Sequence, residues 1–319
     1  MPEPLSPRQP KRPRRFWLFA PYVALLVAVI AWSGFWWAEK LKLERTVRDE
    51  AAALSAQGFT ASFTGMTVTG WPFRLELTLS DVRLAESSGW ALAASRLSGV
   101  TLPYLPDRWV FAAPVGLTLT RPGKGALNVA GRAIRASIGG LGSAEPRYSF
   151  EGLDLVLTPG PGGAPASIAS ASRLELHLQP GPDDQAALLI RLEDAALSPG
   201  SALAAIQPGK PFALTWDARL SHLSALHGGN WPAAVQAWSG AGGAMTLADA
   251  KIGFGGATLE SQGGTFTVGP DGRLKGDAPL KLTSLFNRPS VLSGALDLRF
   301  QDGRAAIGPV NLGPALKIG

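Results

Sequence analysis

Residues 73–84 read Phe-Arg-Leu-Glu-Leu-Thr-Leu-Ser-Asp-Val-Arg-Leu, and apolar side chains alternate with polar ones along this stretch. A period of two places the apolar side chains on one face of a strand and the polar ones on the other. The alternation slips at Ser80-Asp81 and then continues through Val82 and Leu84, which predicts a β-bulge or tight bend. The stretch therefore predicts a strand of an antiparallel sheet with one wet face.

The same alternation returns in four later segments, so strands of this kind are expected to build most of the chain. Their apolar positions are Leu153, Leu155 and Leu157; Leu174, Leu176 and Leu178; Leu188, Ile190 and Leu192; and Leu296, Leu298 and Phe300. The chain also has 38 glycines and 26 prolines among 319 residues, and turn formers at this density favour many short strands. Asp271-Gly272 and Asp302-Gly303 are the best candidates for two-residue hairpin turns.

Three segments outside the strands predict helices, in addition to the apolar run of residues 16–37. Residues 38–57 form the first, a short juxtamembrane helix, because apolar side chains recur at spacings of three or four; these are Leu43, Val47, Ala51 and Leu54. Gly58 is suited to end it. Two short helices are expected around Ser201–Ile206 and Trp231–Trp238. The fold class that follows is mainly β, with an N-terminal helical part, an antiparallel sheet and a few short helices. Few long helices are available to cover the sheet, which favours a curled or barrel-like sheet.

Residues 16–37 are apolar and contain no ionisable side chain except the phenol of Tyr22. A helix of this length spans roughly 33 Å at 1.5 Å per residue, which matches a hydrocarbon core of about 30 Å. Aromatic side chains gather at both ends of the run, as they do at the two surfaces of a bilayer. The sequence predicts one transmembrane helix over residues 16–37, with the lipid bilayer as its partner.

The basic side chains directly before this run set the expected orientation, because positive charge resists translocation. They are Lys11, Arg12, Arg14 and Arg15. Residues 1–15 are therefore expected to form a cytoplasmic tail, and residues 58–319 a periplasmic β-rich domain held at the inner membrane. A cleaved signal peptide is the alternative, with Val29-Ile30-Ala31 as its cleavage site. The apolar run is longer than a usual signal-peptide core, and bulky Trp32 follows that site.

Charge and cysteine content exclude several classes of function. The formal net charge is +6, but residues 1–15 contribute +4 of it and the other 304 residues only +2. A nearly neutral exported domain lacks the excess of positive charge that binds a phosphate backbone, so nucleic acid is not expected as a partner. Cysteine is absent, which excludes disulfides, thiolate metal sites and cysteine nucleophiles.

The residues that carry catalytic chemistry are sparse. The three histidines, His177, His222 and His227, have no metal-ligand spacing, and the adjacent acids Asp183-Asp184 follow Gly181-Pro182 as in a turn. Phosphate-binding, dinucleotide-binding and nucleophile-elbow motifs do not occur in the sequence. We therefore expect no enzyme activity, catalytic residue, metal site or cofactor.

The most distinctive short element is Gly70-Trp71-Pro72-Phe73-Arg74. Proline lacks the N–H that a sheet needs, so Pro72 is confined to an edge, a bulge or the start of a strand. One interpretation is a structural corner at which Trp71 and Phe73 plug the core. The alternative is a ligand site in which Trp71, Pro72 and Phe73 form an aromatic lip on a groove.

The N-terminal anchor, the Gly-Trp-Pro-Phe-Arg element at Gly70–Arg74 and the ending at Asp302–Pro309 resemble bacterial proteins of the domain-of-unknown-function 2125 family. More distantly, the chain is similar to AsmA-like envelope proteins. That resemblance implies a curled sheet with an apolar concave face, and a role in phospholipid handling or envelope maintenance. The competing hypothesis is a scaffold that binds another envelope protein through a sheet edge or the helical stalk.

Overall fold

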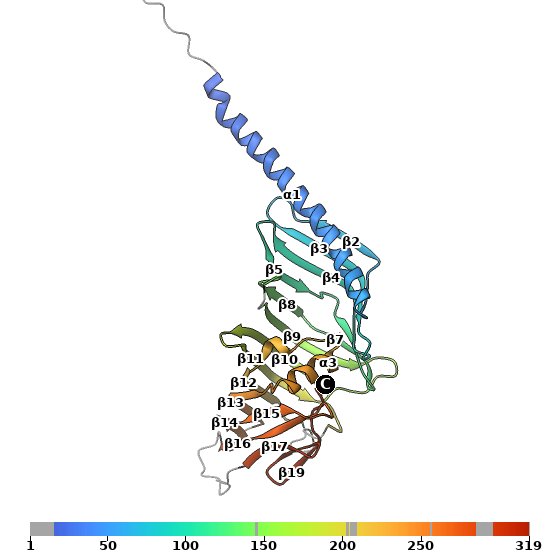
Figure 1. The fold of residues 1–319 in the computed structure, drawn as a ribbon, viewed down its shortest axis with the longest axis vertical. Helices are drawn as coiled ribbons and strands as arrows, with labels where there is room; N and C mark the ends of the chain where they lie inside the picture. Colours follow the sequence, from blue (N-terminus) through green and yellow to red (C-terminus); the bar gives the residue numbers. More distant parts are fainter. Residues whose placement is uncertain are drawn as a thin grey trace, which may run out of the picture.

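The structure of the chain is a computed structural model that describes residues 16–143, 146–201, 204, 209–255, 257–284 and 296–318. The described helices are α1 (Phe16–Ala56), the 3-10 helix η1 (Leu223–Ala225) and α3 (Trp231–Gly240). The strands are β1 (Thr60–Ser62), β2 (Gly65–Thr69), β3 (Leu75–Ala85), β4 (Ala91–Leu102), β5 (Leu105–Ala112), β6 (Leu117–Arg121), β7 (Gly125–Ala130), β8 (Ala133–Gly139), β9 (Arg147–Pro159), β10 (Ile168–Gly181), β11 (Gln185–Leu197), β12 (Phe212–Leu220), β13 (Met245–Phe254), β14 (Ala257–Ser261), β15 (Thr265–Val268), β16 (Leu274–Ser284), β17 (Leu296–Gln301), β18 (Arg304–Ile307) and β19 (Val310–Pro314). The predicted mainly β fold is confirmed (Figure 1).

The strands form one continuous antiparallel sheet that follows the chain (Figure 1). Long strands pair with the next long strand, but two short strands can share the place of one. Between β4 and β9, β5 and β6 pair with successive halves of β4, and β8 and β7 pair with successive parts of β9. Strands β14 and β15 share the place between β13 and β16 in the same way. Figure 1 shows that this long sheet is strongly curled.

Three aspartates inside strands hold a left-handed backbone, which strands rarely contain. The φ angles are 49° at Asp81 in β3, 50° at Asp154 in β9 and 45° at Asp194 in β11. Aspartate tolerates this region better than most residues because its short side chain can hydrogen-bond locally. Such a residue bends a strand and shifts its alternation by one. The bulge or tight bend predicted at Ser80-Asp81 is therefore confirmed as a bend, because β3 and β4 keep the same register on both sides of Asp81.

Each of these aspartates has a hydrogen-bonding neighbour on the next strand or its flank. Thr64 Oγ1 donates to Asp81 Oδ2 at 2.8 Å, Arg132 Nε to Asp154 Oδ2 at 2.6 Å, and Ser172 Oγ to Asp194 Oδ2 at 3.2 Å. The gap between β5 and β6 faces the part of β4 beside Asp81, and the gap between β7 and β8 faces Asp154, so both gaps lie on the same line. We call this line of bends and breaks across the sheet the crease.

Helix α1 joins both predicted N-terminal helices into one helix of 41 residues. Its first part projects beyond the sheet, and its last part runs along the first strands (Figure 1). The predicted stripe of Leu43, Val47, Ala51 and Leu54 lies half-buried on the sheet side, so the last part of α1, which we call the stalk, packs onto the sheet through it. The chain leaves the helix through Gly58, whose φ of +88° favours glycine. Within the described residues, α1 is the one helix long and apolar enough to cross a membrane.

The apolar interior divides into two main clusters. The larger one lies under β10–β19 and is centred on the fully buried Phe266 and on Leu280. The other joins α1 to the first strands through Trp36, Leu77 and Trp109. Helix α3 packs Val235 and Trp238 against Val268 of β15, which covers part of the C-terminal strands. The C-terminal part of the sheet therefore has a filled interior.

Turn and helix predictions had mixed outcomes. Asp302-Gly303 is a two-residue hairpin turn, since Gln301 pairs with Arg304. The two-residue turn at Asp271-Gly272 is wrong: Val268 pairs with Leu274, so residues 269–273 form the loop, closed by a hydrogen bond from Gly269 N to Arg273 O at 2.8 Å. The helix expected around Trp231–Trp238 is confirmed as α3. The helix expected at Ser201–Ile206 lies largely outside the described residues.

Candidate functional site

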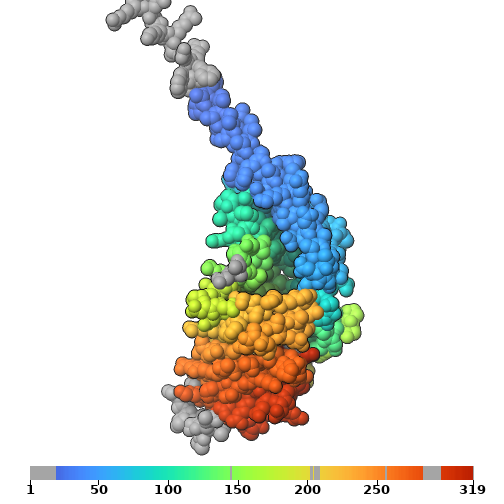
Figure 2. Space-filling model, in the orientation of Figure 1, coloured from blue at the N-terminus to red at the C-terminus, as the bar shows by residue number. Residues whose placement is uncertain are grey.

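An apolar groove lies between α1 and the first strands of the sheet, with a volume of about 450 Å³. Leu43, Val47 and Leu54 of α1 form one wall, and Leu77 of β3 and Phe111 of β5 lie on the sheet side. Figure 2 shows the molecular surface hollowed between the blue helix α1 and the green strands beside it. The groove begins where α1 meets the sheet and follows the stalk.

The walls of the groove follow from two sequence periods. The period of two turns Leu75, Leu77 and Leu79 of β3 to the same face, and the helical stripe turns towards them. Trp109 and Phe111 stack in the groove with ring centroids 5.5 Å apart. The helix and the strands also contribute alanines, Ala51 and Ala61, whose short side chains fill less of the space between the two walls.

The mouth of the groove is charged, in contrast to its interior. Glu39, Lys42 and Glu50 of α1 and Arg83 of β3 border it. The Lys42 ammonium lies 3.7 Å from the Glu39 carboxylate, and the Lys42 side chain remains largely exposed. A site with apolar walls and a charged mouth suits an amphipathic ligand whose polar end stays in water.

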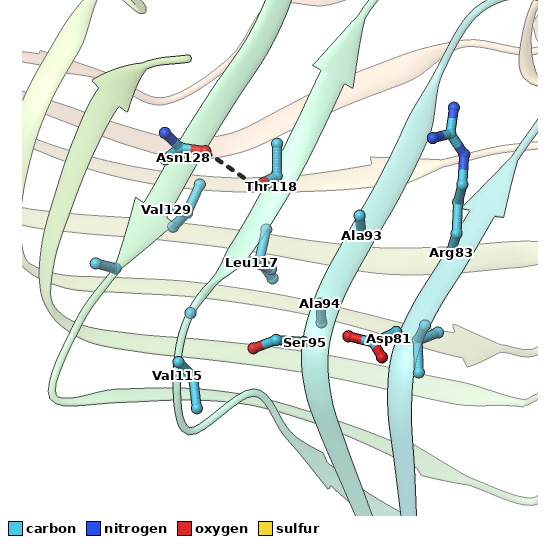
Figure 3. Close-up of a pocket in the computed structure, with 13 residues that line it drawn as sticks. Asp81, Arg83, Ala93, Ala94, Ser95, Val115, Leu117, Thr118, Asn128 and Val129 are labelled. Atoms are coloured by element: carbon cyan, nitrogen blue, oxygen red, sulfur yellow. Dashed lines mark hydrogen bonds between the residues drawn. The ribbon is translucent and has the colours of Figure 1, made fainter. Parts of the chain in front are cut away.

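A second cavity of about 460 Å³ lies at the crease and is much more polar (Figure 3). Asp81 and Ser95 lie side by side on neighbouring strands, while Arg83 points away from Asp81 (Figure 3). Thr118 Oγ1 donates to Asn128 Oδ1 at 2.9 Å. Asp81 is the one carboxylate among the described residues that line this cavity, and no histidine is among them. The cavity offers no acid–base pair and is a consequence of the bent strands.

The sequence-predicted residues Trp71, Pro72 and Phe73 form the turn between β2 and β3, so they do occupy a corner where a strand begins. Their rings do not plug the core, however, because Trp71 is 54% and Phe73 73% exposed. Neither do they line the groove. The backbone of this turn faces α1 instead, and Trp36 and Trp109 supply the buried rings nearby.

Polar clusters elsewhere are explained by local structure. His177 Nδ1 lies 3.0 Å from Ser149 Oγ, and His227 Nδ1 lies 2.8 Å from the backbone oxygen of Ser224. Asp184 accepts hydrogen bonds from Ser224 N at 2.7 Å and Ser224 Oγ at 2.8 Å, and these bonds lower the pKa of its carboxyl. Within the described residues, no three histidine or acidic side chains gather as metal ligands would.

Sequence comparison connects the groove region to a known family. The family model "Uncharacterized protein conserved in bacteria (DUF2125)" matches residues 36–293, from the last two residues of the apolar run through most of the sheet. The matched part includes the stalk, the Gly70–Arg74 turn and every strand that lines the groove. No curated protein and no solved structure matches the chain. The chain therefore belongs to this bacterial family, DUF2125.

Proposed function

We propose that this protein is an inner-membrane-anchored periplasmic protein that takes part in lipid handling or envelope maintenance, and that it has no enzyme activity. The groove between α1 and β3–β5 holds an acyl chain of a phospholipid. The observation that carries this proposal is the apolar groove itself, one wall of which is the continuation of the apolar helix. A lipid leaving the bilayer beside α1 would meet this wall first.

The size and chemistry of the groove support a lipid ligand. Its volume of about 450 Å³ lies in the range of pockets that enclose one small ligand, about 300–1,000 Å³. Each methylene buried there contributes about 0.8 kcal/mol, which favours reversible binding of one acyl chain. The charged groups at the mouth, Lys42 and Arg83 among them, are suited to a phosphate-containing headgroup.

Two further arguments point the same way. The basic residues before the apolar run favour an N-terminus that stays in the cytoplasm and a sheet that is exported. The distant resemblance to AsmA-like proteins, which are linked to phospholipid movement, agrees with a lipid-binding concave surface. The described polar clusters have local structural roles, which supports a binding protein over a catalyst.

Site-specific photocrosslinking tests the proposal in the full chain. A benzophenone amino acid replaces Phe111, which lines the groove, or its neighbour Val110, which is exposed. Successive residues of a strand point to opposite faces, so the two probes differ in face but not in depth. After irradiation in cells, we expect a phospholipid adduct at position 111 by mass spectrometry and little at position 110.

A blocking variant provides the second control. Ala51→Trp fills the groove from the α1 side and should reduce the adduct at position 111 without unfolding the sheet. Equal lipid capture at positions 110 and 111, or capture that Ala51→Trp leaves unchanged, would contradict binding in the groove.

A scaffold role has one observation in its favour. Strand β19 pairs with β18, and among the described strands it has no second neighbour, so its other edge can accept a strand from a partner. The opposite edge of the sheet is contacted by α1. A benzophenone at the exposed Val310 would test this role, since capture of one protein in place of lipid would favour it.

A further inference from the structure

Large apolar side chains gather at the end of the sheet from which the first part of α1 projects. Trp71 and Phe73 are exposed in the turn between β2 and β3. Leu102, Tyr104 and Leu105 are exposed at the tip of the hairpin between β4 and β5. Because Leu75 pairs with Thr101, the two tips lie at the same end of neighbouring strands. We call these five residues the rim.

Two indole hydrogen bonds fix the height of the rim along α1. Trp32 Nε1 donates to the backbone oxygen of Pro72 at 2.7 Å, and Trp36 Nε1 donates to that of Arg74 at 2.9 Å. The turn is thus level with residues 32–36 of the helix. Both bonds use backbone carbonyls of the turn, and the rings of Trp71 and Phe73 remain exposed.

The length of the apolar helix places this level at a membrane surface. From Phe16, a rise of 1.5 Å per residue carries the helix about 30 Å by Trp36, which equals the thickness of a hydrocarbon core. Aromatic rings prefer the headgroup region at that boundary. Cationic groups accompany the rings there: Arg74 lies 3.3 Å from Glu76, and the Lys40 ammonium lies 5.5 Å from the centre of the Trp37 ring.

We propose that the rim is a second membrane contact of the β-domain, inserted in the headgroup region of the bilayer that α1 crosses. The proposal rests on the membrane-anchor part of the proposed function. Two contacts hold the sheet at a fixed tilt, which a single helix does not. Thr101 and Pro106, which flank the hairpin tip, also line the groove, so the rim brings the groove to the lipid surface.

The absence of cysteine allows a direct test by depth-dependent quenching. Single variants of the full chain, Phe73→Cys, Tyr104→Cys, Ile30→Cys and Val115→Cys, carry an environment-sensitive dye. Each is reconstituted in vesicles of phosphatidylcholine and phosphatidylglycerol with quenchers on the headgroup or deep in the acyl chain. Ile30 is exposed within the apolar run. Val115 is exposed and lines the crease cavity. Asp81, which lines the same cavity, lies six residues and about 20 Å from the start of β3.

Insertion of the rim predicts strong quenching of the dye at positions 73 and 104 by the headgroup quencher, with a blue-shifted emission. The dye at position 30 should respond to the deep quencher, and that at position 115 to neither. If the dye at position 30 is quenched while the dyes at positions 73 and 104 respond to neither quencher, the membrane anchor is supported and the rim proposal is overturned. If position 30 is not quenched either, the membrane anchor itself fails and the rim with it.

Discussion

At the residue scale, the curl of this sheet depends on a few aspartates. Asp81, Asp154 and Asp194 adopt a left-handed backbone in the middle of strands, and each accepts a hydrogen bond from a side chain nearby. A strand bent in this way turns its apolar side chains back to the same face after a shift of one residue. Leu192 and Ala195, three residues apart around Asp194, are accordingly both buried.

Substitutions of Asp81 should follow the backbone preference of the new residue. Asp81→Val places a β-branched side chain in the left-handed region and loses the bond from Thr64, so we expect a loss of about 1–3 kcal/mol in the free energy of unfolding. Asp81→Gly and Asp81→Asn should reduce the free energy of unfolding less, because glycine and asparagine tolerate the left-handed region. Urea unfolding of the full chain, followed by tryptophan fluorescence, measures the series.

The matched control for this series is Asp249→Val. Asp249 is exposed in β13, and its backbone lies outside the left-handed region. It also faces Asp217 across the strand pair, so its removal relieves a like-charge contact. If Asp249→Val reduces the free energy of unfolding as much as Asp81→Val does, the left-handed backbone is not the cause of the loss.

Only part of the crease could be predicted from the sequence. At Ser80-Asp81 the alternation visibly slips, because Val82 follows Leu79 by three residues. Around Asp154 the run Leu153-Asp154-Leu155 resembles regular alternation, so no bend was predicted. A Cβ on Gly152 would lie 2.6 Å from Leu155 Cδ1, which shows that residues 152 and 155 share a face. The assignment of Leu153 to the face of Leu155 is therefore wrong.

At the element scale, α1 combines a first part long and apolar enough to cross a membrane with a last part that forms one wall of the groove. Its first part is apolar and exposed, and its last part is amphipathic and half-buried on one side. Trp36, 5% exposed, is the first buried side chain of the helix within the described residues. Both walls of the groove were foreseeable from their periods of two and nearly four. The space between them was not, because a gap depends on side-chain sizes at positions that only the fold brings together.

The tryptophans at positions 36 and 37 offer a matched test of this packing. Trp36 is 5% exposed and Trp37 56% exposed, although they are neighbours in the same helix. Trp36→Ala removes a buried ring and the bond to Arg74, so we expect a loss of about 3–5 kcal/mol and faster hydrogen exchange in residues 38–56. Trp37→Ala should change exchange in the stalk little. Equal effects of both variants would show that the stalk is not held by Trp36.

At the scale of the whole molecule, one contact joins parts of the chain that lie 145 residues apart. Glu86, in the turn between β3 and β4, accepts a hydrogen bond from Trp231 N at 2.9 Å. Asn230 Nδ2 donates to Ser87 Oγ at 3.1 Å beside it. Trp231 Nε1 also bonds to the backbone oxygen of Ile318. The backbone N–H of Trp231, the first residue of α3, thus bonds to the N-terminal part of the sheet, and the Trp231 ring bonds to the C-terminal end of the described chain.

Removal of the Glu86 carboxylate should therefore loosen α3 from a distance in the sequence. A carboxylate at a helix N-terminus contributes about 0.3–1 kcal/mol, and with Glu86→Ala we expect faster hydrogen exchange in Trp231–Gly240 and in residues 315–318. The core under Phe266 should retain its protection, because its packing does not involve Glu86. Glu193→Ala, which removes an exposed acid of β11, serves as the control. If both variants exchange like the unmodified protein, the contact does not couple the two parts of the molecule.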